Sequence, residues 1–231
     1  MFLVGFILVY FVLLGILITV GGSKRLFHHY PAAKTAASLG FLVLALAAFI
    51  GGGRTMPLSE FLVLFAALVL CAGGDILLGF ANVCGGAHGR CFQAGVAVFG
   101  AAHLVFCVLY YTQSPFFWAD GIVPLCALLA TVQLERAGLL RLKKMRLPAL
   151  CYSVLVGLMC SKAVSLVLVM GHTDPHCVLL ALGSVLFMIS DVVLVFMYFG
   201  PKLQDRHRHL ARFWNLTAYY LGVLLIALAT L

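Results

Sequence analysis

The chain has 231 residues, of which 64% are hydrophobic and only 10% are charged. Soluble domains are about half apolar and about a quarter charged, so this composition excludes an ordinary soluble domain, and disordered chains have the opposite balance. The net charge of +8 arises from 15 Lys and Arg against 7 Asp and Glu. Such a charge indicates nucleic-acid binding in a soluble protein but cytoplasmic loops in a membrane protein, and the positions of the charges decide between them.

Apolar segments follow one another along the chain, each close to the length of about 20 residues that a helix needs to cross a bilayer. The eight segments are residues 2–20, 32–50, 57–80, 92–112, 116–134, 147–170, 177–199 and 213–231. Because they and their short loops use the whole chain, we predict an all-α, polytopic membrane protein with eight transmembrane helices in one integral-membrane domain, residues 1–231. The first segment is uncharged and precedes Lys24 and Arg25, so we predict a retained span rather than a signal peptide.

The basic residues are distributed unevenly between the two ends of the predicted helices. Thirteen of the fifteen lie in or beside the loops after the odd-numbered spans: Lys24, Arg25, Lys34, Arg90, Arg136, Arg141, Lys143, Lys144, Arg146, Lys202, Arg206, Arg208 and Arg212. The positive-inside rule places these loops in the cytoplasm and both termini outside, in a multi-pass protein of the cell membrane if the source is bacterial. The charge therefore predicts a topology and no nucleic-acid partner.

The eight cysteines do not form a disulfide pattern. Six of them lie within predicted spans, where cysteine packs as a small apolar residue. Cys84, His88 and Cys91 share a predicted cytoplasmic loop, but a structural zinc site needs four ligands. Free thiols are therefore expected, with no metal and no other cofactor, and a metal at this loop is left as an alternative.

Two segments of the chain resemble each other at an offset of 116 residues. Residues 74–80 and 190–196 share the pattern small-Asp-aliphatic-aliphatic-Leu-x-Phe, and the same offset aligns His103 with Tyr219. We therefore expect two four-helix halves related by a pseudo-twofold axis along the membrane normal, with a site at their interface. These halves are residues 1–112 and 113–231. Chance similarity among apolar helices is the alternative.

Asp75 and Asp191 lie within apolar spans, where a carboxylate is costly unless it is paired, solvated or protonated. Both spans run toward the predicted cytoplasmic end, and both aspartates lie roughly 8–12 Å from that end, at about 1.5 Å per residue. We expect the two carboxylates to converge in a pocket that opens toward the cytoplasmic leaflet. The alternative is that each one satisfies a separate helix contact.

Other polar side chains lie at a similar depth, and this shared depth makes them candidates for the same site. They are Lys34, His103 (nearer the middle of its span), Tyr152, Asn215, Tyr219 and Tyr220. The alternatives are that the His and Tyr residues are packing residues and that Lys34 extends to the headgroups. Lys162 lies farther toward the outer side, and we expect no role for it beyond pairing with a partner that the sequence does not identify. Asp120 and Glu60 lie near outer helix ends, where solvation is expected.

Six segments carry a resemblance to a known family when they are taken in chain order. They are Pro31-Ala32-Ala33-Lys34, Gly74-Asp75, Phe99-Gly100-Ala101-Ala102-His103, Tyr152, Leu186-Phe187-Met188-Ile189-Ser190-Asp191 and Ala218-Tyr219-Tyr220. With these segments the chain resembles the YhhN family of lysoplasmalogenases. The resemblance implies an eight-span membrane enzyme that hydrolyses the vinyl ether bond of lysoplasmalogens to a fatty aldehyde and glycerophosphoethanolamine or glycerophosphocholine. The family often has Gln where this chain has Val223, which leaves the substrate's headgroup open.

The implied reaction is acid-catalysed. A proton added to the β-carbon of the vinyl ether gives an oxocarbenium ion, which water attacks before the hemiacetal collapses. We expect Asp75 and Asp191 to act as one protonated acid and one carboxylate, because two neighbouring carboxylates in a low dielectric do not both ionise easily. The headgroup, the ether oxygen and water are expected to be bound by Lys34, His103, Tyr152, Asn215, Tyr219 and Tyr220. The reaction requires no metal.

Two other functions compete with this hydrolase hypothesis. Paired carboxylates in a membrane also serve proton-coupled transport, so a transporter is the first alternative. A transporter needs access from both sides in turn, and the candidate residues favour one leaflet, which argues against it. A non-catalytic membrane protein is the second alternative. Under the hydrolase hypothesis, the chain's partners are a lysophospholipid substrate and the lipid bilayer.

Overall fold

The computed structural model describes all residues except 1, 54, 85, 87, 88, 171–173 and 202–204. The described part of the chain is helical and contains no strand. Its α-helices are α1 (Phe2–Gly22), α2 (Tyr30–Gly51), α3 (Leu58–Cys84), α4 (Arg90–Gln113), α5 (Ile122–Arg136), α6 (Arg146–Met170), α7 (Pro175–Phe199) and α8 (Asp205–Leu228). Short 3-10 helices precede α2, α5 and α6: η1 (Phe27–His29), η3 (Trp118–Gly121) and η4 (Lys143–Met145).

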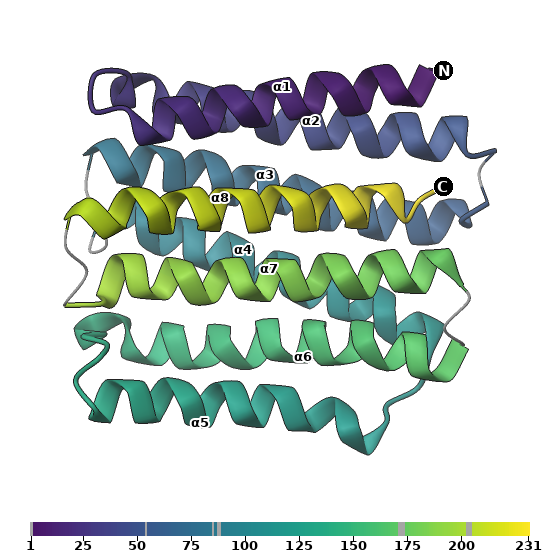
Figure 1. Ribbon diagram of the computed structural model, residues 1–231. Coiled ribbons are helices and arrows are strands. Elements are labelled where there is room, and N and C mark those ends of the chain that lie inside the picture. Colours follow the sequence, from purple (N-terminus) through teal and green to yellow (C-terminus); the bar gives the residue numbers. More distant parts are fainter. Residues whose placement is uncertain (1, 54, 85, 87–88, 171–173, 202–204) are drawn as a thin grey trace.

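Eight helical segments in the described part are long and apolar enough to cross a membrane, which confirms the predicted fold class and number of spans. The helices lie side by side and alternate in direction, and both termini lie at the same end of the bundle (Figure 1). The chain is a multi-pass membrane protein by the length and composition of these helices. Which end faces the cytoplasm stays a prediction of the charge distribution.

Two helices differ from their predicted spans. α8 begins at Asp205, whereas an apolar segment was expected only from residue 213. Residues 205–212 are mostly polar or basic, so hydropathy misses them, although the helix continues through them beyond the apolar region. α5 has only 15 residues, about 22 Å, which is shorter than the roughly 30 Å of a hydrocarbon core. The 3-10 helix η3 leads directly into α5 and lengthens this helical span to Trp118–Arg136, whereas residues 114–117 before it are non-helical.

A buried ion pair supports this segment between α4 and α5. The Lys162 ammonium, on α6, donates to the carbonyl oxygen of Pro115 at 2.6 Å and lies 3.3 Å from a carboxylate oxygen of Asp120. Asp120 is fully buried and accepts a hydrogen bond from the backbone N–H of Phe117. The expectation that Asp120 is solvated was therefore wrong. Non-helical backbone in a membrane persists only where the protein satisfies its polar groups, as Lys162 does here.

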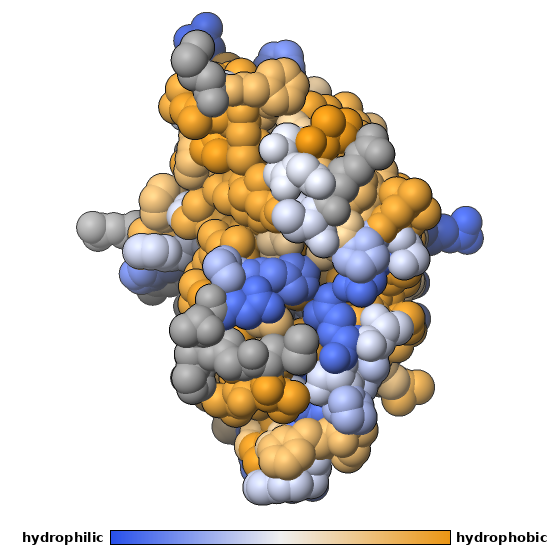
Figure 2. Space-filling view, turned by 90° about the vertical axis from the view of Figure 1, so that its right-hand side faces the viewer, coloured by the Kyte–Doolittle hydropathy of each residue, from blue (hydrophilic) through white to orange (hydrophobic). Residues whose placement is uncertain are grey.

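Glu60 lies at the end of the bundle where the two termini are found, and it is half-buried. One of its carboxylate oxygens accepts a hydrogen bond from the Gln113 amide at 2.9 Å, and that amide also lies 3.2 Å from Nε2 of His176. Polar side chains gather near the centre of this end of the molecule, with apolar side chains around them (Figure 2). Glu60 is thus held by protein partners rather than by solvent alone.

The packing order of the first four helices is repeated by the last four, with one exception. α1 packs on α2, α2 on α3 and α3 on α4, and α5 to α8 pack in the same sequence. α1 also packs on α8, but the equivalent pair, α5 and α4, makes little contact. α5 packs on α6 and η3 instead. The two halves thus differ where α5 stands apart from α4.

Candidate functional site

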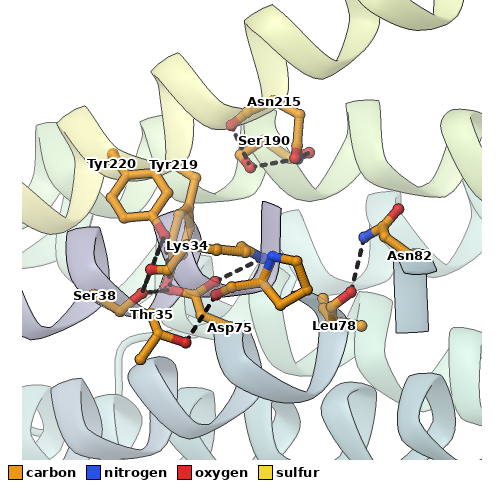
Figure 3. Close-up of polar contacts among 11 residues, drawn as sticks. Lys34, Thr35, Ser38, Asp75, Leu78, Asn82, Ser190, Asn215, Tyr219 and Tyr220 are labelled. Carbon is orange, nitrogen blue, oxygen red and sulfur yellow. Dashed lines mark hydrogen bonds and ion pairs between the residues drawn. The ribbon is translucent and has the colours of Figure 1, made fainter. Parts of the chain in front are cut away.

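Asp75 on α3 lies at the centre of the first polar cluster (Figure 3). Its Oδ1 lies 2.9 Å from the Lys34 ammonium, and its Oδ2 accepts hydrogen bonds from the hydroxyls of Ser38 at 2.6 Å and Tyr219 at 2.8 Å. The Tyr220 hydroxyl lies 3.5 Å from the same oxygen. Asp75 is fully buried, and α2 and α8 supply its partners. One ammonium and several hydroxyl donors suit an ionised carboxylate, which accepts all of these bonds.

Asp191 on α7 forms the second cluster with residues of α4 and α6. The Tyr152 hydroxyl donates to its Oδ2 at 3.0 Å, and the same oxygen lies 3.5 Å from Nε2 of His103. Nδ1 of His103 lies 2.6 Å from the carbonyl oxygen of Phe99, which only accepts, so Nδ1 carries a hydrogen. Nε2 of His103 thus faces the Asp191 carboxylate without a hydrogen bond between them.

The two clusters are neighbours, but no hydrogen bond joins their carboxylates, each of which has partners of its own. The ring of Phe187 packs against both the His103 ring at 4.9 Å and the Tyr219 ring at 5.0 Å, so it lies between the clusters. Phe99 packs edge-on against both Phe187 and Tyr219. The convergence of the two carboxylates therefore stays a prediction, and in the structure aromatic rings link their clusters.

Asn215, another predicted residue, contacts neither carboxylate. Its side-chain amide donates to the carbonyl oxygen of Ser190 at 2.9 Å and to the Ser190 hydroxyl at 2.8 Å, and that hydroxyl donates back to the Asn215 carbonyl oxygen. Asn215 thus holds α8 against α7 at the residue before Asp191 (Figure 3). It is a positioning residue for the second cluster.

The contacts of the two aspartates agree with the internal repeat. Tyr219 bonds to Asp75, and His103 faces Asp191. Both aspartates and both partners are 116 residues apart, so the aligned residues make equivalent contacts in the two clusters. The two halves stay a prediction, which this equivalence supports.

A cavity of about 380 Å³ lies between α4, α5, α6 and α7, on the side where α5 stands apart from α4. Its walls are almost wholly apolar, and α5 contributes a helical stripe that includes Val123, Ala127 and Leu134. Among the described residues that line it, Asp191 is the one carboxylate, and it lies beside Tyr152. The volume lies within the range of small-molecule sites. The second cluster thus faces an apolar space, whereas the Asp75 carboxylate is enclosed by its partners.

A profile of the YhhN family matches residues 29–230. The chain belongs to the YhhN family. No curated protein and no solved structure matches it. The match confirms the resemblance seen in the sequence, and it includes both aspartates and all their partners named above. Val223, where the YhhN family often has Gln, is fully buried in the core.

The structure adds residues that the sequence interpretation missed. Ser38 completes the Asp75 cluster, and its signal was its position four residues after Lys34, on the same helix face. Arg212 had been counted only as a topology charge. Within the described residues, no three His, Cys, Asp or Glu side chains come together as a metal site. His88 and the side chain of Cys84 lie outside the described residues, while Cys91 is exposed and free. Six other cysteines are also free, as expected, and four of these are buried.

Close helix approach beside Asp75 depends on Gly74. A Cβ atom at this position meets the Phe99 ring at 2.6 Å, whereas one at the neighbouring Gly73 meets only Val98, at 3.6 Å. We expect Gly74→Ala to displace Phe99 and to destabilise the protein by about 1–3 kcal/mol, whereas Gly73→Ala is neutral. Thermal unfolding in detergent measures both. Equal melting temperatures for the two variants would show that Phe99 yields without cost.

Proposed function

We propose that this protein is a lysoplasmalogenase-like hydrolase that cleaves the vinyl ether bond of lysoplasmalogens, with Asp191 as the proton donor. The observation that carries the proposal is the placement of Asp191, a carboxyl group that faces Nε2 of His103 at 3.5 Å, on the wall of an otherwise apolar cavity. Membership of the YhhN family is consistent with this activity. An alkenyl chain fits an apolar space of this kind, and its reactive double bond then lies beside the one acid in the walls.

The chemistry follows from the contacts of Asp191. Its carboxyl proton passes to the β-carbon of the vinyl ether, and the ether oxygen donates electron density to form the oxocarbenium ion. The new carboxylate, held by Tyr152 and His103, stabilises this cation and then takes a proton from the attacking water. The resulting hemiacetal loses its hydroxyl proton as the bond to the glycerol oxygen breaks, and that oxygen is protonated. The products are a fatty aldehyde and a glycerophosphodiester, and the acid is regenerated.

Asp75 has a supporting role in this proposal. Its ion pair with Lys34 carries no net charge, and its bonds to the hydroxyls of Ser38 and Tyr219 hold the Tyr219 ring against Phe187, which packs in turn on His103. Asp75 is thus a positioning residue for the cluster of Asp191, with no hydrogen bond between the two carboxylates.

The purified protein is expected to release fatty aldehyde from a lysoplasmalogen but none from the saturated 1-O-alkyl analogue, which has no double bond to protonate. Reaction in D₂O is expected to place one deuterium on the carbon next to the aldehyde. Reaction in ¹⁸O-water is expected to leave the glycerophosphodiester unlabelled, because water attacks the alkenyl carbon. Label in the glycerol hydroxyl, or no aldehyde from correctly folded protein, would contradict the proposal. Mass spectrometry of both products measures these outcomes.

A further inference from the structure

A second, small pocket lies among α2, α3, α7 and α8, and its walls are polar where those of the large cavity are apolar. Two cationic side chains line it, Lys34 and Arg212, together with the amides of Asn82 and Asn215 and the phenol rings of Tyr30 and Tyr198. All of these groups lie near the helix ends that carry the basic loops. The pocket therefore presents two positive charges and several hydrogen-bond donors at the predicted headgroup side of the site.

Arg212 is the unusual member of this pocket. Its Nη1 donates to the Gly21 carbonyl oxygen at 2.7 Å, and its guanidinium lies over the rings of Phe27 and Tyr30. Within the described residues, no carboxylate lies within 4 Å of it, and its Nε is buried without a hydrogen-bond partner. A half-buried cation in a membrane protein is costly without an anion. The Lys34 charge, by contrast, is already balanced by Asp75.

The polar pocket and the apolar cavity share two wall residues, Leu78 of α3 and Leu194 of α7. Leu194 is three residues after Asp191, so it lies about 4.5 Å farther along the axis of α7. A lysophospholipid has the same sequence of parts: an anionic phosphate, a short glycerol unit, the ether bond and an apolar chain. The order along the site is likewise cationic pocket, shared leucines with Asp191 close by, and apolar cavity.

We propose that Arg212, with Lys34 and Asn82, binds the phosphate group of a lysophospholipid whose chain occupies the apolar cavity. The inference rests on the proposed function for the identity of the lipid. Guanidinium groups bind phosphate oxygens through two parallel hydrogen bonds, for which Nε and an Nη are the suitable pair. The free space is only about 10 Å³, so the long Arg212 side chain moves to admit the anion.

The test measures binding, so it does not depend on turnover. Wild-type protein in nanodiscs is titrated with 1-O-alkyl-glycerophosphoethanolamine and with the phosphate-free 1-O-alkylglycerol. We expect the phosphate to tighten binding by about tenfold to a hundredfold, the range for hydrogen bonds to charged groups. Arg212→Gln is expected to abolish this preference, whereas Arg208→Gln, an exposed arginine one turn earlier on α8, retains it. Equal affinities of the two lipids for wild-type protein would overturn the proposal, whatever the stability of the variants.

Chain-free competitors distinguish a lipid headgroup from a free phosphate. Inorganic phosphate and glycerophosphoethanolamine are expected not to displace the phospholipid at equal concentration, because they make no contact in the apolar cavity. Displacement by inorganic phosphate would overturn the assignment to a lipid. The two proposals fail separately. Phosphate preference without aldehyde release would refute only the hydrolase, and equal turnover of lysoplasmalogen and 1-alkenylglycerol would refute only the phosphate site.

Discussion

Replacement of Asp191 by Asn is expected to lower the turnover of lysoplasmalogen by about a hundredfold to ten-thousandfold, the usual contribution of a general acid. Asn has nearly the shape of Asp, and its oxygen still accepts the hydrogen bond from Tyr152, but its amide does not deliver a proton to carbon. Aldehyde release by the purified variant measures the effect. Folding is expected to be retained, since Asp191 has no ion-pair partner other than His103 within the described residues.

Asp174 provides a matched control on the same helix. It caps the first turn of α7 through a hydrogen bond from the backbone N–H of His176, and Asn caps helices as well as Asp does. Asp174→Asn is therefore expected to leave turnover unchanged. Asp75→Asn differs from both variants because it leaves the buried Lys34 ammonium without its counter-charge, so we expect lower stability together with lower turnover. Near-normal turnover by Asp191→Asn would remove Asp191 from the acid's role.

Hydropathy and charge predicted the features of this fold that vary along the membrane normal. The eight spans, the uneven basic loops and the shared depth of Asp75 and Asp191 all follow from counting residues along helices of known rise. Which side chains meet at that depth depends on the rotation of each helix and on which helices are neighbours, and neither is encoded in hydropathy. The sequence thus identified both Lys34 and Asp75 as candidates. It did not reveal that these two side chains pair with each other, or that Lys34 lies apart from Asp191.

The internal repeat predicted more of the lateral arrangement than hydropathy did. It aligned His103 with Tyr219 before the partner of either residue was known. In the structure Tyr219 lies beside Asp75 and His103 beside Asp191, so each contacts the aspartate of the other predicted half. Its limit was the assumption of symmetry. The apolar cavity lies where α5 stands apart from α4, a difference between the halves that an alignment of aspartate motifs does not reveal. The proposed substrate cavity therefore lies where the two halves differ, on the side where α5 stands apart from α4.

Asp120 and Lys162 show how a local interpretation of charges fails. Each was considered alone, one as a solvated carboxylate and one as a cation whose partner was not identified. Ser114-Pro115 was the sequence signal of a break between α4 and α5, and residues 114–117 are non-helical in the structure. Polar backbone in that segment needs partners, and the buried cation on α6 supplies one to Pro115. The pair is therefore structural, and its removal tests stability rather than turnover.

Replacement of Lys162 by Met is expected to destabilise the protein by about 3–5 kcal/mol, because it leaves the fully buried Asp120 carboxylate without its counter-charge. The carbonyl oxygen of Pro115 and the hydroxyl of Ser114 lose their donor in the same step. Thermal unfolding in detergent is the measurement. Lys144→Met, which removes an exposed lysine before α6, is the matched control and is expected to be neutral.

The double variant Lys162→Met with Asp120→Asn separates the charge from the packing. The amide oxygen introduced by the second substitution still accepts the hydrogen bond from the backbone N–H of Phe117, but the side chain carries no charge to bury. We therefore expect the double variant to be more stable than Lys162→Met alone, although less stable than the wild type because Pro115 still lacks a donor. If the double variant is no more stable than Lys162→Met alone, the unpaired Asp120 carboxylate carries no cost. That result would show that water reaches Asp120 in the absence of Lys162, and that the ion pair is not needed to neutralise a buried charge.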